Sequence, residues 1–284
     1  MKISGTDLIL NPDGSVYHLH LLPEHIGDTI VAVGDPDRVP KVSRYFDTLD
    51  FKMNKREFVT HTGTLGGKKI SAISTGIGTD NVEIFFNEID ALVNIDLKTR
   101  EPKSKTQKLK VVRIGTSGAL QEDIELGSHL ISDYALGLDN MMSYYKLFPD
   151  EHAQSLSEKI QKHTGLPFSP YVVRGSVELY HTIGRDMILG NTITSPGFYA
   201  PQGRTLRLPI QFPNLLDELR DFRAGDFRFT NFEMETAGYY GLGKLLGHEV
   251  ASVNAIIANR VTQIFSKDPD AVIDALIKKV LERI

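Results

Sequence analysis

One segment of the chain combines an arginine with small residues in a way that suits the binding of an anion. Val111, Val112 and Ile114 form an apolar run typical of a buried strand, yet Arg113 lies inside it. A strand buried on both faces gains little from a guanidinium unless that charge meets a carboxylate or an anionic ligand, and open α/β sheets bind ligands at the carboxyl ends of their strands. We expect the strand to end in a turn formed by Gly115-Thr116-Ser117-Gly118, whose backbone amides can approach a ligand closely.

Two further arginines lie beside glycines or at strand edges, Arg38 at the end of Gly34-Asp-Pro-Asp-Arg38 and Arg56 after Lys55. The planar guanidinium matches the oxygens of a phosphate, and a glycine-rich turn adds backbone donors. Each arginine alone is explained equally well by a surface ion pair. Together with Gly34 and Thr116, the three arginines predict an oxyanion-binding site. No Gly-x-x-x-x-Gly-Lys-Ser/Thr motif occurs, so this would not be a Walker-type nucleotide site.

A pair of glutamates, Glu233 and Glu235, flanks Met234 at the entry to an apolar stretch that is expected to be a helix. An acid at a helix N-terminus is favoured by the helix dipole, which explains one of the two glutamates. The second interpretation gives a glutamate to a sugar, where its carboxylate accepts hydrogen bonds from two hydroxyls at once. Met234 would then lie as an apolar floor under the sugar.

A loop at residues 196–201 is rich in proline, glycine and aromatic residues, and two polar residues, Gln202 and Arg204, follow it. Phe198 can stack on a planar base. A glutamine side chain donates and accepts in one plane, which fits a carbonyl–NH edge, whereas an arginine only donates. The alternative is an ordinary surface loop.

The residues expected of a metal site or of a nucleophilic enzyme do not form a recognisable pattern. The chain has no cysteine, no HExxH motif and no Gly-x-Ser-x-Gly elbow. His18 and His20 are two residues apart near the N-terminus, but such a pair without a third ligand is more often structural. We therefore predict no metal site and no cofactor.

Composition indicates a single α/β domain over residues 1–284, because 41% hydrophobic and 24% charged residues in a chain of this length can bury a large core. A formal net charge of −4 argues against a general nucleic-acid binder. The absence of cysteine suits a reducing cytosol, and no apolar run is long enough to cross a bilayer. We expect a cytoplasmic protein that binds neither nucleic acid nor membranes.

Strands and helices are expected to alternate after an irregular N-terminal extension at residues 1–15. Residues 51–74 are predicted to form antiparallel strands around Gly66-Gly67, and residues 98–110 a solvated basic loop that resembles an insertion. Further strands are predicted at 29–33, 127–134, 171–176 and 249–257, and helices at 81–94, 151–163, 233–246 and 270–284.

Seven motifs in this order resemble those of the nucleoside phosphorylase family with the trimeric or hexameric α/β/α fold, and most closely its uridine phosphorylase branch. They are Gly34-Asp-Pro-Asp-Arg38, Arg56-Glu-Phe58, Ser74-Thr-Gly-Ile-Gly78, Arg113-Ile-Gly-Thr-Ser-Gly-Ala119, Phe198-Tyr…Gln202-Gly-Arg204, Phe232-Glu-Met-Glu-Thr236 and Asn259-Arg-Val-Thr-Gln263. The resemblance covers roughly residues 16–284. It implies a three-layer α/β/α domain around a central mixed, partly barrel-like sheet.

The resemblance also implies roles for the residues in these motifs. Phosphate would be bound by Gly34, Arg38, Arg113 and Thr116, with Arg56 from a neighbouring subunit. The ribose would be held by Glu233, Met234 and Glu235, and by His18 of the neighbour at the 5′ end. The base would meet Phe198, Gln202 and Arg204. Arg113, Arg204 and Glu235 are the residues that we expect to be catalytic.

Two departures from the family pattern concern specificity and ions. The purine branch carries an aspartate after its penultimate strand, where this chain has Ala258-Asn259-Arg260, and this favours uracil over a purine. Some members build a monovalent-cation site at the dimer interface from a glutamate, an isoleucine and a serine. Glu57 and Ile77 match the first two, but Asn81 stands at the third position, so a cation site stays an open question.

The expected activity is that of a pentosyltransferase acting in nucleoside salvage. Uridine, or another pyrimidine nucleoside, would react reversibly with phosphate to give the base and ribose 1-phosphate, with inversion at C1′. The alternatives are a purine nucleoside phosphorylase, a nucleosidase of the same superfamily and a non-catalytic nucleoside-binding module. A nucleosidase has no use for three phosphate-facing arginines. The resemblance further implies a homo-oligomer, at least a dimer and by expectation a hexamer built as a trimer of dimers.

Overall fold

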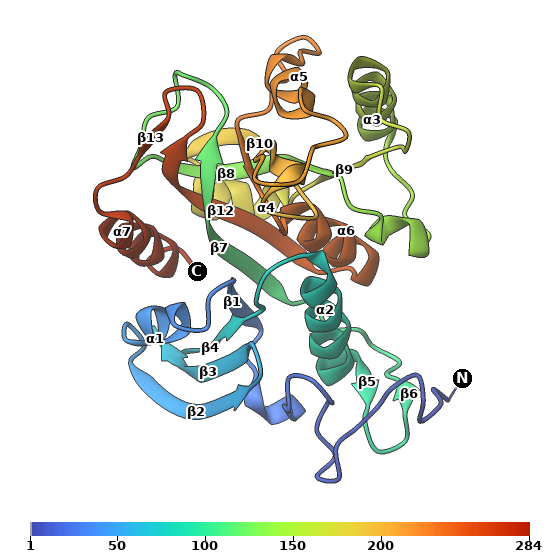
Figure 1. Cartoon of the computed structure of the whole chain (residues 1–284). Coiled ribbons are helices and arrows are strands. Elements are labelled where there is room, and N and C mark those ends of the chain that lie inside the picture. Colours follow the sequence, from blue (N-terminus) through green and yellow to red (C-terminus); the bar gives the residue numbers. More distant parts are fainter. Residues whose placement is uncertain (1) are drawn as a thin grey trace. The chain divides into compact units, whose positions relative to one another are not determined.

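The computed structural model describes residues 2–284, which divide into two compact units (Figure 1). Unit 1 comprises the chain up to Arg113 together with Leu242–Glu249, and unit 2 comprises Ile114–Gly241 and Val250–Ile284. Strand β7 (Lys110–Ala119), helix α6 (Thr236–Leu246) and strand β12 (Glu249–Asn259) each contain residues of both units. The assignment of residues 1–284 to a single domain stays a prediction.

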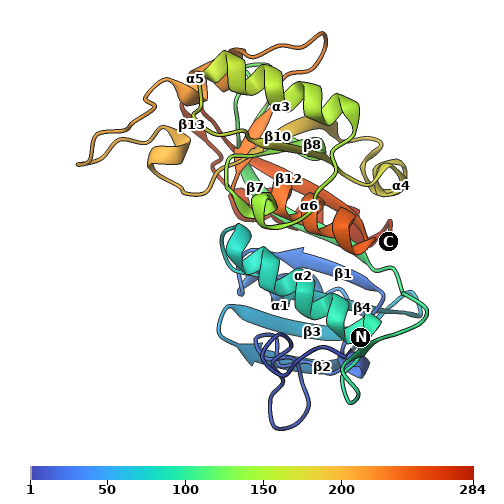
Figure 2. The same ribbon diagram turned by 90° about the vertical axis from the view of Figure 1, so that its right-hand side faces the viewer.

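Unit 1 is built on a sheet of four strands in the order β1 (Thr29–Val33), β4 (Lys68–Ser74), β3 (Phe58–Leu65) and β2 (Thr48–Lys55). Strand β1 pairs with β4 in parallel, and the other two pairings are antiparallel. Helices α1 (Arg38–Ser43) and α2 (Thr79–Asn94) lie on opposite sides of this sheet (Figures 1 and 2). The layers of unit 1 are therefore helix, sheet and helix.

The antiparallel part of unit 1 was predictable from its turns. Gly66 and Gly67 both have positive φ, 56° and 76°, as a two-residue hairpin turn requires. A second tight turn at Arg56-Glu57 joins β2 to β3. The predicted helix at 81–94 is confirmed as α2. The predicted basic loop at 98–110 contains the short strand β6 (Glu101–Pro102), which pairs with β5 (Ile95–Asp96) just before the loop.

Unit 2 contains five strands that pair in a closed ring. Beginning with β12, the order is β8 (His129–Gly137), β10 (Ile188–Thr194), β11 (Asn231–Glu233) and β7, which pairs with β12 again. The pairings β8–β10 and β10–β11 are parallel, whereas β11–β7 and β12–β8 are antiparallel. This ring confirms the predicted mixed, partly barrel-like sheet. Strand β9 (Tyr171–Arg174) extends it from β8, and β13 (Ile264–Phe265) from β12.

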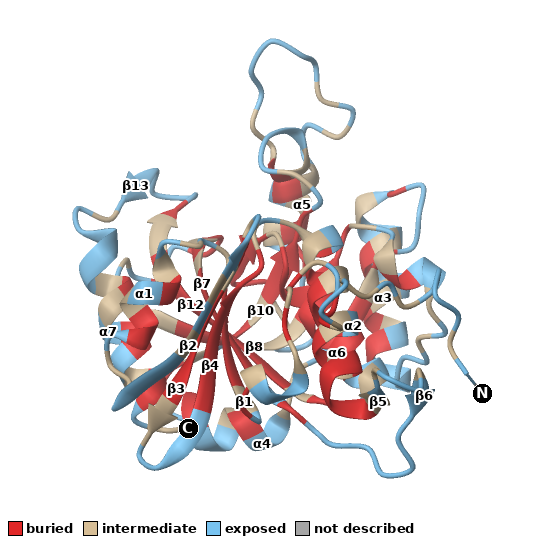
Figure 3. Ribbon diagram, turned by 90° about the horizontal axis from the view of Figure 1, so that it is seen from below, coloured by how far each residue is buried: buried red, intermediate tan, exposed pale blue. Residues whose placement is uncertain are grey.

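The helices of unit 2 are α3 (Glu151–Thr164), the single turn α4 (Val177–Leu179), α5 (Leu215–Asp221), the greater part of α6 and α7 (Pro269–Leu281). The start of α3 is capped by Asp150, which accepts a 2.8 Å hydrogen bond from the Ala153 amide, and its end by Gly165 at φ 63°. Leu156 and Ile160 of α3 pack with Leu219 of α5 in one buried cluster. Figure 3 shows buried residues concentrated on the strands and on the helix faces that cover them.

Two sequence predictions in this region are wrong in their details. Residues 115–118 form no turn, because β7 continues to Ala119. Small residues are needed there since the Phe232 ring lies directly against Gly118, where a Cβ would be 3.0 Å from the ring. The helix predicted from Glu233 begins at Thr236, because Glu233 pairs with Thr194 as the last residue of β11. Among residues 2–284, no helix has both the length and the apolar character needed to cross a membrane.

We expect His61 on β3 to make the stability of the protein depend on pH. Burial, with a smaller effect of Lys52, lowers the pKa of the His61 imidazole below its ordinary value of 6.5, and Ser43 Oγ lies 2.7 Å from its Nδ1. The unfolded chain therefore binds the proton more readily, and the free energy of unfolding falls as the pH drops through 6.5. Urea denaturation at pH 7.5 and 5.5 should show a smaller decrease for His61→Gln than for the wild type. Equal decreases would contradict this assignment.

Candidate active site

Three loops of unit 1 meet at the edge of the sheet where β1 and β4 end. Gly34 follows β1, and a Cβ at this position would lie 3.4 Å from the Gly76 carbonyl oxygen in the loop after β4. A Cβ on Gly76, which has φ 75°, would lie 3.1 Å from Cγ of Glu57 in the β2–β3 turn. The carboxyl ends of parallel strands are the usual place for a ligand in such sheets.

Ser74, the last residue of β4, fixes the turn that carries Arg56. Its hydroxyl donates to the Glu57 carbonyl over 2.5 Å and accepts from the Val59 amide over 2.8 Å. Arg56 has φ 54°, a left-handed conformation that costs a non-glycine residue roughly 1–2 kcal/mol. A strained residue held in place by its surroundings is typical of functional sites, and the Arg56 side chain is exposed on this turn.

The other predicted phosphate ligands are divided between the two units. Arg38 begins α1, and its amide donates to the Asp35 carbonyl over 3.0 Å, which folds the loop after β1. Arg113 is 4% exposed and belongs to unit 1, whereas Thr116 lies three residues further along β7 in unit 2. Within unit 1, the loop after β4 that contains Gly76 therefore lies beside both Gly34 and the Arg56-Glu57 turn.

His18 is fixed by a carboxylate that sequence analysis missed. Glu88 of α2 accepts hydrogen bonds from the backbone amides of His18 and Leu19, and its Oε1 lies 2.7 Å from His18 Nδ1. This contact leaves Nε2 as the ring atom that can meet a ligand. His20 has φ 56° and contacts Asp13 instead, which helps to lower the pKa of Asp13 to about 2, although hydrogen bonds from Ser15 contribute more.

The three residues considered for a cation lie close together in unit 1. A Cβ on Gly76 would be 2.7 Å from Asn81 Nδ2 and 3.1 Å from Glu57 Cγ. Asn81 Nδ2 donates a 3.3 Å hydrogen bond to the Ile77 carbonyl. The Asn81 side chain therefore presents its NH₂ group to this carbonyl, and not its oxygen. Within residues 2–284 no group of three or more His, Cys, Asp or Glu side chains is arranged to hold a metal.

The predicted base-binding residues of unit 2 form one cluster. The Arg204 guanidinium lies over the Phe198 ring, 3.8 Å from its centre, and 5.6 Å from the centre of the Phe232 ring. Arg204 Nη1 donates to the Phe198 carbonyl over 2.7 Å and to the side-chain oxygen of Gln202. Gln202 is buried, whereas Phe198 is 51% exposed. An aromatic face, an amide and a guanidinium are thus held next to one another.

Arg260 adds a second positive charge beside the loop that carries Gln202 and Arg204. Arg260 Nη2 donates to the Gly203 carbonyl over 3.0 Å. Burial, and after it the charge of Arg260, lowers the pKa of the Arg204 guanidinium, while Tyr199 opposes the shift. An oxygen that carries partial negative charge would therefore be stabilised at this position.

Glu233 has a clear structural task at the start of α6. Its carboxylate accepts hydrogen bonds from the amides of Glu235 and Thr236, each 3.0 Å long, and from the Thr194 hydroxyl over 2.7 Å. This arrangement agrees with the interpretation of one glutamate as a helix N-terminal acid. Met234 and Glu235 occupy the corner between β11 and α6, and Glu235 is 7% exposed.

Sequence analysis missed Glu88, Phe232 and Arg260 as parts of these clusters. Glu88 could have been noticed as a charged residue beside Phe85, Ile89 and Leu92 on the apolar face of α2. Phe232 and Arg260 lie in motifs that were recognised, but no local pattern relates either to the loop at 198–204. Their proximity follows from the pairing of strands that are distant in sequence.

Comparison with known proteins identifies the family of the chain. The sequence model of the Phosphorylase superfamily matches residues 28–282. The chain therefore belongs to the Phosphorylase superfamily, and the predicted resemblance is confirmed.

Among its relatives, the uridine phosphorylase of Thermococcus kodakarensis is 32% identical over 259 residues, which are 90% of this chain and 81% of that protein. The uridine phosphorylase of Escherichia coli is 27% identical over 254 residues, 87% of each chain. A crystal structure of Trypanosoma brucei nucleoside phosphorylase, which shows uridine phosphorylase activity, has a TM-score of 0.90 at 28% identity and covers 98% of this chain and 99% of that one.

We expect a side chain at position 118 to destabilise the protein through Phe232. In Gly118→Val the new Cβ would lie 3.0 Å from the Phe232 ring, which must move, and overpacking of this kind costs about 1–3 kcal/mol. Urea denaturation measures the loss. Gly5→Val is the matched control, because no atom lies within 4 Å of a Cβ at Gly5. An equal effect of the two substitutions would contradict the contact.

Proposed function

We propose that the chain is a uridine phosphorylase. It catalyses the reversible reaction of uridine with inorganic phosphate, which gives uracil and ribose 1-phosphate with inversion at C1′. The observation that carries this proposal is the cluster of Phe198, Gln202 and Arg204. It holds an aromatic ring, an amide and a guanidinium next to one another, and this combination suits a planar base with two carbonyl groups.

The base cluster explains how the bond to uracil can break. As the glycosidic bond lengthens, negative charge moves onto the uracil ring and its carbonyl oxygens. Arg204 supplies donors for this charge, and because Gln202 Oε1 is held by Arg204, the Gln202 amide nitrogen remains to donate to the base. Stabilising the leaving group in this way requires no full proton transfer.

Asn259 supports a pyrimidine rather than a purine base. Its Nδ2 donates to the carbonyls of Gln121 and Ile124, and its Oδ1 accepts from the amides of Val261 and Thr262 at 2.9 and 3.1 Å. Both ends of the amide are thus used in shaping the β12–β13 turn. The purine branch would place an aspartate here to protonate the base, so a purine phosphorylase is disfavoured.

The sugar and the phosphate are assigned to the remaining predicted residues. Met234 and Glu235 hold the ribose hydroxyls, Glu233 fixes this corner, and Nε2 of His18 meets the 5′ end. The residues that bind the phosphate dianion offer guanidinium, hydroxyl and backbone donors. They are Gly34, Arg38, Arg56, Arg113 and Thr116. The bound dianion also stabilises the positive charge of the oxocarbenium-like sugar. Three arginines of this kind argue against a nucleosidase, which uses water.

The working unit in this proposal is a homo-oligomer in the cytoplasm. Arg56 and His18 act on the substrate of a neighbouring subunit, so a dimer is the minimum, and a hexamer built as a trimer of dimers is the expected assembly. Phosphate is the co-substrate, and the reaction takes no further cofactor. Light scattering that gives the mass of a monomer would refute the shared site.

The reaction is tested by following the ultraviolet absorbance of uridine and, separately, of inosine with and without phosphate. We expect loss of uridine only when phosphate is present. Cleavage without phosphate would indicate a nucleosidase, preferential cleavage of inosine would overturn the base assignment, and tight binding of uridine without turnover would indicate a non-catalytic binding module.

Arg204→Met should lower kcat/KM for uridine by roughly 100-fold or more, because loss of a charged hydrogen bond in the transition state costs about 3 kcal/mol. Arg207→Met is the matched control, since Arg207 is an exposed arginine three residues away. Steady-state kinetics would contradict the role of Arg204 if both variants kept wild-type kcat/KM.

A further inference from the structure

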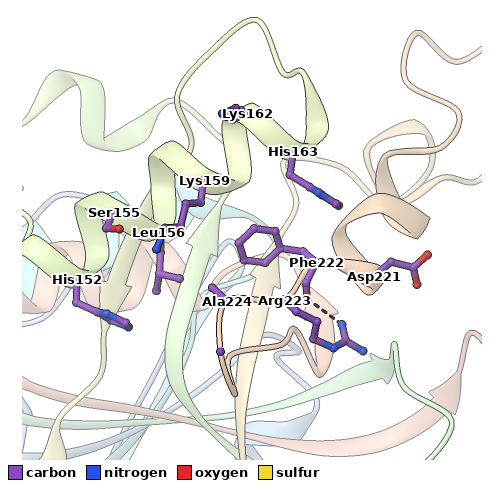
Figure 4. A pocket seen from close by; sticks show the side chains of 11 residues that line it. His152, Ser155, Leu156, Lys159, Lys162, His163, Asp221, Phe222, Arg223 and Ala224 are labelled. Atoms are coloured by element: carbon purple, nitrogen blue, oxygen red, sulfur yellow. Dashed lines mark hydrogen bonds between the residues drawn. The ribbon is translucent and has the colours of Figure 1, made fainter.

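A second concave site lies within unit 2, between α3 and the segment that follows α5 (Figure 4). Its volume is about 1020 Å³, and none of the residues assigned to phosphate, ribose or base lines it. One wall is a single face of α3 from His152 to His163, and the opposite wall is formed by residues 221–225. The eleven residue-to-residue steps from His152 to His163 correspond to roughly 16 Å of helix, so the site is long enough for a nucleotide-sized molecule.

The rim of this pocket is cationic. Lys159 and Lys162 are exposed on the α3 wall and Arg223 on the other. Asp221 is the acidic member of the lining, and it already pairs with Arg220, whose Nε lies 2.9 Å from Asp221 Oδ1. The hydrogen bond from Arg220 also lowers the pKa of Asp221, so this carboxylate stays ionised but is balanced by its partner. The remaining charge of the lining is positive.

The two lysines and the arginine contribute differently. Arg223 Nη1 donates to the carbonyls of Arg220 and Phe222, and Nη2 donates to Gln121 Oε1 over 3.1 Å, so this guanidinium is a fixed charge. Among residues 2–284, no side chain or carbonyl pairs with Lys159 or Lys162. Both ammonium groups are therefore available as donors, and their i, i+3 spacing places them on the same side of α3.

Contacts between the two walls hold the pocket in place. His163 Nε2 lies 3.0 Å from the Glu218 carbonyl oxygen, and its ring packs edge-on against Phe222 at 5.4 Å between centres. Leu156 and Phe222 are buried at the base of the pocket and belong to the core cluster of this unit. The site is thus a rigid apolar floor with a cationic rim, which suits a molecule that carries a phosphate on an organic body.

We propose that this pocket binds a small organic phosphate of nucleotide size. The phosphate lies between Lys159 and Lys162 in the field of Arg223, and the organic part lies over Leu156 and Phe222. Size separates this ligand from free phosphate, which would leave most of the pocket empty. The proposal concerns a site apart from the one assigned to uridine, and it does not depend on the proposed reaction.

Calorimetric titration with uridine 5′-monophosphate tests the site. The double variant Lys159→Ala/Lys162→Ala should bind it about tenfold more weakly than the wild type, because two charge-assisted contacts to the phosphate are lost. Lys105→Ala/Lys267→Ala, which removes two exposed lysines elsewhere, is the matched control and should bind normally. Lys159→Arg/Lys162→Arg should also retain binding.

The controls separate this site from the one for uridine. Nucleotide that enters only the uridine site would bind the wild type and the Lys159→Ala/Lys162→Ala variant alike, which would overturn the proposal. Inorganic phosphate that binds as tightly as the nucleotide would overturn the assignment of an organic ligand. Uridine turnover should be unchanged in the Lys159→Ala/Lys162→Ala variant, so failure of the proposed reaction would be seen separately in the wild type.

Discussion

The hydrogen bonds of the Glu233 carboxylate are the interactions on which the corner between β11 and α6 depends. The carboxylate accepts hydrogen bonds from the amides of Glu235, just before α6, and of Thr236, its first residue, and from the Thr194 hydroxyl of the neighbouring strand β10. The Thr194 hydroxyl in turn accepts from the Ala237 amide over 2.9 Å. A single buried charge therefore joins two strands to a helix N-terminus, where the dipole favours it. The corner that presents Met234 and Glu235 has little freedom as a result.

The ring of strands in unit 2 imposes a second constraint, which is the close approach of side chains to β7. Phe232 pairs across the sheet with Gly118, and its ring lies in the space that a side chain at Gly118 would fill. Arg204 then lies between the rings of Phe232 and Phe198. A glycine in a strand thus determines where an arginine of a distant loop can lie, and the arginine determines the orientation of Gln202. The arrangement of the Phe198, Gln202 and Arg204 cluster therefore depends on the packing of the strand ring.

The sequence predicted the elements well where local signals are strong. The alternation of strands and helices, the Gly66-Gly67 turn and the strand at 29–33 depend on periodicity and turn chemistry, which neighbouring residues determine. The turn at 115–118 was predicted wrongly because small residues mark either a loop or a crowded strand, and only the pairing of β7 with β11 decides which. For the same reason no local pattern revealed the contact of Glu88 with His18 or of Arg260 with the base loop. The roles of the motif residues came from the family resemblance, because spacing alone left each of them with a structural explanation.

The Glu233 carboxylate shapes the corner at the start of α6, whereas the proposed role of Glu235 is to bind the sugar. The most direct measurement compares Glu233→Gln with Glu235→Gln in both urea denaturation and uridine kinetics. Glu233→Gln should lower the free energy of unfolding by about 1–3 kcal/mol, because charged hydrogen bonds to buried amides are weakened. Glu235→Gln should unfold close to the wild-type midpoint but lose roughly 100-fold in kcat/KM. The reverse outcome, an unstable Glu235→Gln and a stable but inactive Glu233→Gln, would contradict this division of roles.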